Sequence, residues 1–392
     1  MNMPSMLPAF LLISIIFIVV SPNGAVGSPQ FSAMFVFGDS IVDDGNNNNL
    51  NTRAKANFVP YGIDFNKGPT GRFCNGKTII DFLGDLLGLP YLPAFTSTNT
   101  TGTNILNGVN YASAGAGILD ESGRHLVMPS NLAILQFLQT VSLTFTQLYN
   151  MTQGDRFTLT QQVKNFQTTL NQLKSQMNAE QLSQYLAKSL VVMILGSNDY
   201  INNYLLPSLY PTTSRLKPKE YADLLINRYT QQILALQGLG LRKFVLAGVG
   251  PLGCIPSQLA SGAAPRGKCV SFVNDIVGLF NQQLSSLVDQ LNANHSGAIF
   301  VYGNTFTGFT DILNNPRSYG FWVTDTAFCG FGRHQGQVSC LPFFFPCLFR
   351  DQYVFWDAFH PTQAVNKIIA QRAYTGPPSD CYPINVKQMA EM

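Results

Sequence analysis

Short apolar runs alternate along this chain with longer stretches in which apolar residues recur at helical spacing. The runs are typical of strands that are buried on both faces. They lie at residues 33–37, 109–112, 190–195, 243–249 and 298–302. The helical stretches lie between them, at 78–87, 161–177, 221–236 and 270–291. This alternation predicts a three-layer α/β/α fold with a central, mainly parallel sheet and helices on both faces.

The amino-terminal stretch follows a different pattern. Residues 7–20 are almost entirely apolar, and the small residues Ala25 and Gly27 follow within SPNGAVGSPQ. This pattern predicts a secretory signal peptide over residues 1–27, cleaved between Gly27 and Ser28. The apolar run is shorter than the roughly 20 residues of a transmembrane helix, so no stable membrane anchor is expected. Residues 28–392 contain no repeat, charge run or Ser/Pro-rich linker, which favours a single domain.

Sequons and cysteines fit a secreted, extracellular chain. Asn99, Asn150 and Asn294 begin sequons and are candidate glycosylation sites. Seven cysteines lie beyond the expected cleavage site, at positions 74, 254, 269, 329, 340, 347 and 381. In an oxidising compartment this odd number predicts up to three disulfides and one free thiol, and 254/269 and 340/347 are the first candidate pairs. No CxxC motif occurs, so we expect no zinc site.

Composition narrows the class of partner. Hydrophobic residues make up 46% of the 392 residues, charged residues make up 11%, and the net charge is +3. Such a chain can bury a large core, and it lacks the concentrated basic charge with which proteins bind nucleic acid or a membrane surface. We therefore expect a globular protein with no nucleic-acid partner.

Three of the apolar runs end in clusters of small and polar residues. The clusters are FGDS with Ser40, YASAGAG with Gly115, and LGSND with Asn198. The carboxyl ends of parallel strands meet at one edge of a sheet, and ligands bind in the crevice beyond that edge. Each cluster alone could be an ordinary turn. Together they predict one site.

A serine nucleophile requires a base, and His360 stands in the most suggestive context. It follows Asp357 by three residues, and Pro361 can begin a helix whose apolar positions repeat at helical spacing. The Asp357 carboxylate can then hold imidazole Nδ1–H while Nε2 faces Ser40. The alternative is structural, with Asp357 capping the helix and His360 merely buried.

The other three histidines are less suitable candidates for the general base. His295 lies in a sequon among polar residues, which favours an exposed position. His334 lies in the loop-like sequence GFGRHQGQ, and His125 has no acidic residue at a useful spacing. His360 is therefore the candidate base.

Four blocks of this sequence resemble, in order, those of the plant-type GDSL esterase/lipase family within the SGNH hydrolases. The blocks are FGDSIVDDGNNNN, GVNYASAGAGI, LGSNDY and DAFHP. The resemblance extends from about residue 31 to residue 374. It implies a flavodoxin-like SGNH hydrolase fold and a carboxylic ester hydrolase that works without a metal or organic cofactor. The first block reads Gly-Asp-Ser-Ile rather than Gly-Asp-Ser-Leu, an exchange of aliphatic residues that should leave the chemistry unchanged.

The resemblance also implies a role for each matching residue. Ser40 would be the nucleophile, His360 the general base and then acid, and Asp357 the group that orients the imidazole. The oxyanion hole would consist of the backbone N–H groups of Ser40 and Gly115 and the side-chain amide of Asn198.

The chemistry explains why these residue types are needed. A neutral serine hydroxyl is a poor nucleophile until a base removes its proton. The charge that develops on the carbonyl oxygen needs preorganised donors. In SAGAG the resemblance leaves Gly117 as an alternative donor to Gly115. No GxSxG pentapeptide occurs, so hydrolases with a nucleophile elbow fit less well.

Three other stretches resemble functional motifs or could line a site, and each has a structural interpretation as well. GVGPLG at 248–253 spells GxGxxG, but Pro251 stands where a dinucleotide-binding helix would begin. GAAPRGKC at 262–269 is close to a phosphate loop but ends in Cys269 in place of Ser or Thr. CLPFFFPCLF at 340–349 is either a core segment stapled by a disulfide or an apolar wall over an acyl chain.

We therefore expect a secreted serine esterase/lipase that hydrolyses acyl esters of lipids or small alcohols through an acyl-Ser40 intermediate. An acyltransferase or a polysaccharide acetyl esterase would use the same triad, and these motifs do not separate the three. A catalytically silent secreted binding protein would show a broken block, whereas all four blocks are intact.

Overall fold

A six-stranded sheet forms the centre of the structure, in the order β2-β1-β3-β4-β5-β6. The computed structural model describes residues 30–125, 154–263, 265, 268–342 and 348–392. Neighbouring strands from β2 to β5 pair in parallel, and β6 pairs antiparallel with β5. The strands are β1 (Met34–Gly38), β2 (Gly108–Asn110), β3 (Leu190–Ile194), β4 (Lys243–Ala247), β5 (Ile299–Gly303) and β6 (Cys381–Tyr382).

The strands are apolar on both faces because both faces are covered. In β1, Phe35 and Phe37 enter one hydrophobic cluster, while Met34 and Val36 enter a second cluster on the opposite face. Successive side chains of a strand point to opposite faces, so an unbroken apolar run fills two cores at once. This explains why the predicted strands are runs rather than alternating patterns.

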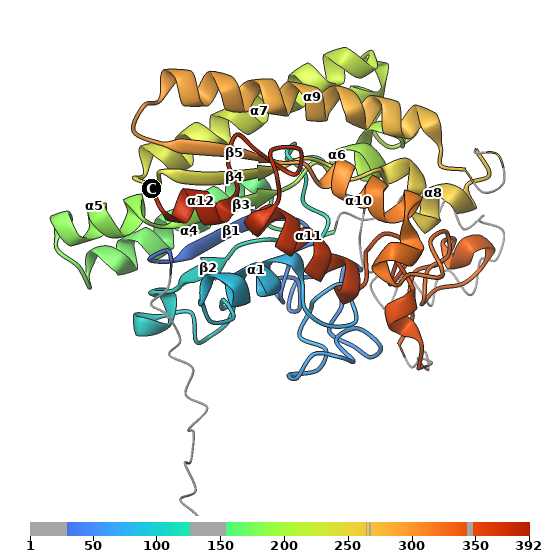
Figure 1. Ribbon diagram of the computed structural model, residues 1–392, viewed down its shortest axis with the longest axis horizontal. Helices are drawn as coiled ribbons and strands as arrows, with labels where there is room; N and C mark the ends of the chain where they lie inside the picture. The colour runs from blue at the N-terminus through green and yellow to red at the C-terminus, as the bar shows by residue number, and fades with distance from the viewer. Residues whose placement is uncertain (1–29, 126–153, 264, 266–267, 343–347) are drawn as a thin grey trace, which may run out of the picture.

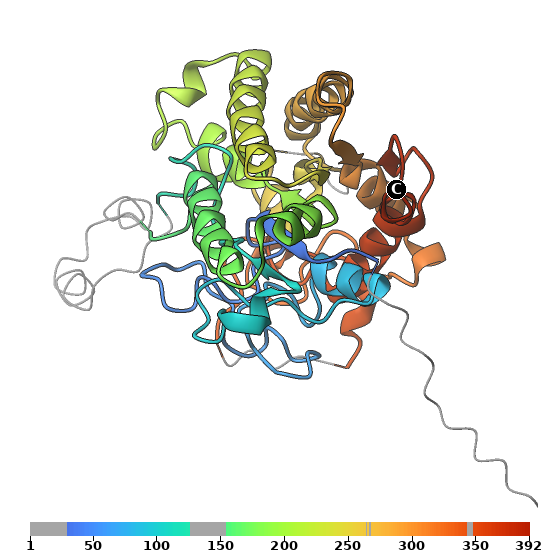
Figure 2. The same cartoon turned by 90° about the vertical axis from the view of Figure 1, so that its left-hand side faces the viewer.

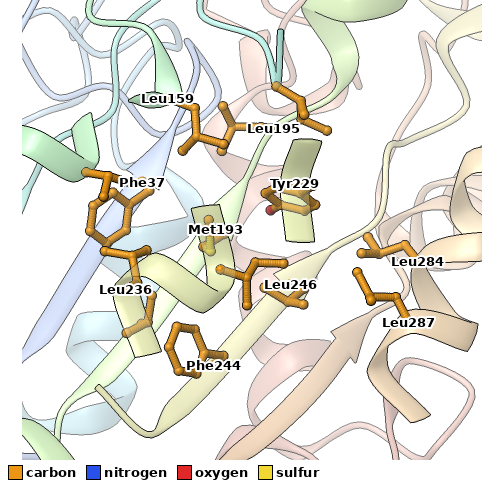
Figure 3. Close-up of a cluster of buried hydrophobic side chains, with 14 of the residues drawn as sticks. Phe37, Leu159, Met193, Leu195, Tyr229, Leu236, Phe244, Leu246, Leu284 and Leu287 are labelled. Carbon is orange, nitrogen blue, oxygen red and sulfur yellow. The ribbon is translucent and has the colours of Figure 1, made fainter. Parts of the chain in front are cut away.

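The first face is covered by four helices. They are α4 (Leu159–Lys174), α5 (Ala179–Ala187), α7 (Pro218–Gly238) and α9 (Ser271–Asn294). Figure 3 shows the core that they share with the sheet, where Phe37, Met193 and Leu246 of the strands meet side chains of the helices. The labelled helical residues there are Leu159 from α4, Tyr229 and Leu236 from α7, and Leu284 and Leu287 from α9.

The second face is covered by four other helices. They are α1 (Ile79–Leu87), α10 (Thr305–Asn314), α11 (Gln363–Thr375) and α12 (Val386–Ala390). Figures 1 and 2 show α7 and α9 on one side of the sheet and α1 and α11 on the other. The short helices α6 (Ser197–Asp199) and α8 (Pro256–Ala260) follow β3 and β4. No helix within the described ranges is both long enough and apolar enough to cross a membrane.

The predicted strands and helices occur in the predicted order, with differences at several element ends and some further elements that were not predicted. Helix α1 begins at Ile79 because Thr78 caps it in a reciprocal pair with Asp81. The expectation that Pro361 begins a helix is wrong, since α11 begins at Gln363 with Thr362 as its N-cap. Pro361 instead forms an isolated bridge with Phe355. Helices α5, α6, α8, α10 and α12 and the two-residue strand β6 were not predicted from the sequence.

The cysteine pairs confirm one expectation and correct another. Cys254 and Cys269 form the predicted disulfide. Cys340 pairs with Cys329, so the 340/347 pair is wrong; Cys347 itself lies outside the described residues. The reason is local, because a bridge between Phe331 and Val338 brings the chain back on itself and places positions 329 and 340 side by side.

The free thiols also depart from expectation. Cys74 and Cys381 are both buried and both unbridged. Within the described residues there are therefore two disulfides and two free thiols, where the sequence analysis expected a single free thiol.

Candidate active site

Sheet topology brings the three strand-end clusters together. Strand β1 lies between β2 and β3, and its last residue, Gly38, is in register with Ile194 of β3. Beyond the strands, Ser113 N–H donates to Gly38 C=O and Asp39 N–H donates to Ile194 C=O. The segments that follow β1, β2 and β3 therefore stay next to one another past the sheet edge. This is where the sequence analysis placed Ser40, Gly115 and Asn198.

The turn that carries Ser40 is fixed from both sides. Gln162 of α4 donates to Gly38 C=O and accepts from Gly38 N–H, each at 2.9 Å. Asp39 C=O accepts from the N–H groups of Val42 and Asp43, which closes the turn around Ser40. A side chain at position 38 would collide with Val42, so this motif position requires glycine. The Ser40 side chain is left half-buried just beyond the end of β1.

His360 and Asp357 meet Ser40 from the other end of the chain. His360 Nε2 lies 2.7 Å from Ser40 Oγ. On its other side, His360 Nδ1 lies 2.8 Å from Asp357 Oδ1 and 2.9 Å from Oδ2. Asp357 is almost fully buried and His360 is 8% exposed. The structure thus brings together the serine, imidazole and carboxylate that the sequence analysis selected, in a continuous row of hydrogen-bond distances.

The Asp357 carboxylate is held by several donors. Its Oδ1 accepts from Phe359 N–H and His360 N–H, and its Oδ2 accepts from Tyr61 O–H at 2.6 Å. Burial alone would raise the pKa of Asp357. The neighbouring His360 and the hydrogen bonds outweigh that effect and hold the pKa below its usual value. Asp357 is therefore ionised at neutral pH.

Asn198 lies against the loop that follows β2. Its Nδ2 donates to Ala116 C=O at 2.9 Å, which uses one of the two amide hydrogens. Asn202 donates to Asn198 Oδ1 and so settles which end of the amide points toward the loop. Among the described residues, neither Ser40 N–H nor Gly115 N–H has a hydrogen-bond acceptor. The second Asn198 hydrogen and these two N–H groups are candidate donors to a ligand, and so is Gly117 N–H, which also has no acceptor among the described residues.

Gly115 and Gly117 differ in their surroundings. Gly115 has a φ of 84°, a backbone conformation that favours glycine. A Cβ at Gly117 would lie 2.6 Å from Asp199 Oδ1, so that position is pressed against the Asp199 side chain. Asp199 in turn accepts from Ile118 N–H and Leu119 N–H. The Gly117 side of the turn thus faces a structural carboxylate.

Buried carboxyl groups surround the nucleophile and its loop. Asp43 accepts from the N–H groups of Gly45, Asn46 and Ala114. Burial raises the pKa of Asp39 to about 7 and the pKa of Asp43 and Asp199 to about 6. Asp39 Oδ2 has no hydrogen-bond partner within the described part of the chain. The carboxyl groups of Asp39, Asp43 and Asp199 accept hydrogen bonds from backbone N–H groups of the surrounding loops and make no hydrogen bond to the His360 ring.

The other histidines take part in separate contacts. His125 Nδ1 lies 3.1 Å from Tyr210 O–H, and burial lowers the pKa of His125 to about 4. His295 contacts Gln237, and His334 Nδ1 lies 2.8 Å from Asp325 C=O. None of these contacts involves Ser40.

GVGPLG does not lead into a nucleotide-binding helix. Pro251 of GVGPLG precedes a single turn of 3-10 helix, and Asn281 holds the loop through Val249 N–H and C=O. The GAAPRGKC stretch lies partly outside the described residues. Among the residues the structure describes, no group of three His, Cys, Asp or Glu side chains could hold a metal ion.

Among its described residues, the apolar stretch at 340–349 is buried only at the first, since Cys340 is 4% exposed and bridged to Cys329. Leu341, Leu348 and Phe349 are 48%, 86% and 65% exposed. Residues 343–347 lie outside the described residues. The interpretation as a stapled core segment therefore holds at Cys340 and is wrong for Leu341, Leu348 and Phe349.

Several contributors to the site were missed from sequence. Asn46 and Asn47 of DDGNNNN donate to backbone C=O groups between Asn110 and Ala114, and so fasten the loop after β2 to the loop after β1. Tyr61 lies 296 positions from the carboxylate that it contacts. The asparagine run is a visible signal, whereas nothing in the sequence around Tyr61 points to Asp357.

Comparison with known proteins is consistent with this geometry. Residues 34–373 match the profile of a family described as GDSL-like lipase/acylhydrolase. The chain is 53% identical over 379 residues to the Arabidopsis thaliana protein GDSL esterase/lipase At1g71250, covering 97% of this chain and 94% of that protein. It is 54% identical over 367 residues to GDSL esterase/lipase At5g08460 from the same plant, covering 93% and 88%.

A third relative, GDSL esterase/lipase 7 from Arabidopsis thaliana, is 47% identical over 368 residues and covers 93% of each chain. The six-stranded, mainly parallel sheet between two helical layers is the SGNH hydrolase fold expected of this family. The match over most of the chain also shows the class of reaction. The chain therefore belongs to the GDSL-like lipase/acylhydrolase family and is a carboxylic ester hydrolase.

Proposed function

We propose that this protein is a secreted serine esterase/lipase that hydrolyses acyl esters through an acyl-Ser40 intermediate. The observation that carries the proposal is the 2.7 Å separation of His360 Nε2 and Ser40 Oγ, with Asp357 on the opposite ring nitrogen. A serine with a base at this distance, and a base with a carboxylate behind it, is the arrangement that nucleophilic acyl transfer requires.

The first half of the reaction acylates the serine. His360 Nε2 takes the Oγ proton as Oγ attacks the ester carbonyl carbon, which gives a tetrahedral intermediate with a negative oxygen. The intermediate collapses when its bond to the leaving alkoxide breaks, and His360 gives that oxygen the proton. The alcohol leaves, and the acyl group stays on Ser40.

The second half returns the enzyme to its starting state. Water gives a proton to His360 Nε2 as its oxygen attacks the acyl carbon. The second tetrahedral intermediate collapses, the bond to Ser40 Oγ breaks, and His360 returns the proton to Oγ. The carboxylic acid is released. Asp357 accepts Nδ1–H throughout, which keeps Nε2 facing Ser40 and stabilises the imidazolium.

The oxyanion is stabilised by the donors that the fold leaves available. We assign Ser40 N–H, Gly115 N–H and the second Asn198 Nδ2–H to this role. They come from three different strand ends that the sheet holds in register. Donors that are fixed before the reaction begins stabilise the developing charge without further reorganisation.

Secretion and domain organisation are part of the proposal. Residues 1–27 would be a signal peptide, and they lie outside the described residues, as does Asn150. Asn99 and Asn294 are exposed, as glycosylation requires, and the two disulfides fit an oxidising compartment. Residues 28–392 would then fold as one mature domain.

The test combines one substitution with a graded substrate panel. Purified wild type and Ser40→Ala are incubated with p-nitrophenyl esters of increasing acyl length and with acetylated xylan, with and without an added alcohol. Wild type should release acid from the acyl esters, and Ser40→Ala should lose about 10⁶-fold in kcat with its melting temperature retained, a larger loss than that expected of any change at Asp357. Near-full activity in a folded Ser40→Ala would contradict the mechanism, and products that are mainly new esters would indicate an acyltransferase.

A further inference from the structure

Tyr61 extends the row of Ser40, His360 and Asp357 by one further hydrogen bond. Its O–H donates to Asp357 Oδ2 at 2.6 Å, and its side chain is 3% exposed. We propose that Tyr61 is a positioning residue for ester hydrolysis, whose hydroxyl holds the Asp357 carboxylate in the orientation that accepts His360 Nδ1–H. This inference rests on the proposed function of the three residues.

The two carboxylate oxygens of Asp357 are held in different ways. Oδ1 accepts from two backbone N–H groups, those of Phe359 and His360, which belong to the same short turn. Apart from the imidazole itself, Tyr61 O–H is the one donor to Oδ2 among the described residues. The backbone therefore fixes one oxygen, and the rotation of the carboxylate about its Cβ–Cγ bond depends on Tyr61.

Aromatic packing fixes the position of the Tyr61 ring. The Phe58 ring meets it edge-on at 5.2 Å between centroids, and the Phe73 ring at 5.9 Å. Phe73 also packs on the His360 ring at 5.0 Å. One segment thus places a hydroxyl on the carboxylate and a ring on the imidazole of the same pair.

The same segment is fastened to both flanks of the Asp357–His360 turn. Before the turn, Arg350 Nε donates to Asp64 Oδ2 at 2.6 Å. After the turn, Gln363 N–H donates to Asn75 Oδ1 at 2.8 Å. Asn75 Nδ2 in turn donates to Asp64 Oδ2, which joins the two attachments. Tyr61 therefore approaches Asp357 from a frame that cannot shift without breaking several contacts.

Tyr61 also stays a donor across the working pH range. Burial, together with the charge of Asp357, raises the pKa of Tyr61 well above its usual value, so the hydroxyl keeps its proton. The Cys74 thiol also lies near this carboxylate, and burial raises its pKa to about 12. Tyr61 and Cys74 are therefore both uncharged beside Asp357 at neutral pH, and on the Ser40 side Asp39, whose pKa burial raises to about 7, interacts with His360.

The test removes the hydroxyl and leaves the ring. With p-nitrophenyl butyrate as substrate, Tyr61→Phe should lower kcat about tenfold and leave KM within about twofold. The loss is expected because the substitution removes a hydrogen bond to the charged Asp357 carboxylate, which orients His360. Without the Tyr61 hydrogen bond, the negative charge of the Asp357 carboxylate is less stabilised by other donors. Asp357 should then stabilise a proton on His360 more strongly. The acid limb of the kcat/KM profile should therefore move to higher pH.

Tyr111→Phe is the matched control. Tyr111 is also fully buried, and its O–H donates to Thr169 Oγ1 at 2.7 Å, inside the core rather than at Asp357. It should lose a similar amount of melting temperature and keep both kcat and the acid limb. If Tyr61→Phe does not fold, Tyr61→Met supplies an apolar side chain without a hydroxyl and should show the same loss of kcat.

The outcomes separate this inference from the mechanism beneath it. If Ser40→Ala is inactive but Tyr61→Phe keeps kcat within twofold and an unmoved acid limb, Tyr61 is structural and the inference is wrong while the mechanism stands. If folded Ser40→Ala keeps its activity, the proposed mechanism itself is wrong. A loss of kcat in Tyr111→Phe equal to that in Tyr61→Phe would also overturn the inference, because it would show a general effect of core destabilisation.

Discussion

The carboxyl groups on the two sides of Ser40 are buried to a similar degree but ionise differently. On one side, Asp357 contacts an imidazole, and its pKa lies below the usual value. On the other side, Asp39, Asp43 and Asp199 contact backbone N–H groups, and burial raises their pKa to about 6 or 7. The difference arises from the partners, because Asp357 accepts hydrogen bonds from the His360 ring and Tyr61 O–H in addition to backbone N–H groups, and together these offset the cost of burying its charge.

This comparison separates a chemical role from a scaffolding role. Stabilising an imidazolium requires a negative charge, and Asp357 is held ionised beside His360. Holding a loop requires acceptor oxygens, which a carboxyl group offers in either protonation state. Asp43 and Asp199 can therefore keep the loop after β2 in place near neutral pH even when their charge changes.

Among the carboxyl and oxyanion substitutions, the largest loss of kcat is expected at Asp357. Asp357→Asn keeps the shape of the side chain but removes the charge and favours the wrong imidazole tautomer, so kcat should fall by about 10⁴-fold. Steady-state kinetics on an acyl ester would measure it, with the melting temperature as a check on folding. A loss below tenfold would show that the carboxylate is needed for structure alone.

A smaller loss is expected from the oxyanion side. Asn198→Ala removes one donor to the developing negative charge, so kcat should fall by about 10²- to 10³-fold with little change in KM. Asn202→Ala, which removes the partner of Asn198 Oδ1, should cost less because the donor itself remains. An equal loss in both variants would indicate that Asn198 acts through loop packing and not as a donor.

The smallest expected effect concerns stability and distinguishes the two kinds of carboxyl. A carboxyl whose pKa is raised on folding binds protons more tightly in the folded state, so its contribution to stability is present below about pH 4 and is lost as pH rises through the folded value. The free energy of unfolding should therefore decline between pH 4 and 7, over the range set by Asp39, Asp43 and Asp199.

Asp39→Asn should flatten this decline. The amide oxygen can still accept from Ile41 N–H, while the titrating group is gone. The slope should change by at most about 1.4 kcal/mol per pH unit, and urea titrations at four pH values would measure it. Identical slopes in wild type and Asp39→Asn would show that Asp39 does not titrate in this range.

The strand-end half of the site was predictable because it follows from topology. Ser40, Gly115 and Asn198 each follow a buried apolar run, and parallel strands of one sheet must end at the same edge. The order of strands along the sheet placed Ser40 between the other two, which no single motif states. Local pattern was sufficient here because the scaffold is regular.

The other half depends on contacts between segments far apart in the chain. Asp357 and His360 were recognisable as a pair, but Pro361 does not begin a helix, because the segment that carries them doubles back and pairs Phe355 with Pro361. Tyr61 could not be predicted for the same reason. Irregular segments are positioned by side-chain contacts that have no sequence period.

The most direct test of the central claim is where a serine-reactive probe becomes attached. A fluorophosphonate reacts when the nucleophile oxygen attacks phosphorus and fluoride leaves, which requires an activated serine. Peptide mass spectrometry of labelled wild-type protein should place the adduct on Ser40, and folded Ser40→Ala should remain unlabelled. An adduct on another residue in the wild type, or equal labelling of Ser40→Ala, would contradict the assignment of Ser40 as the nucleophile.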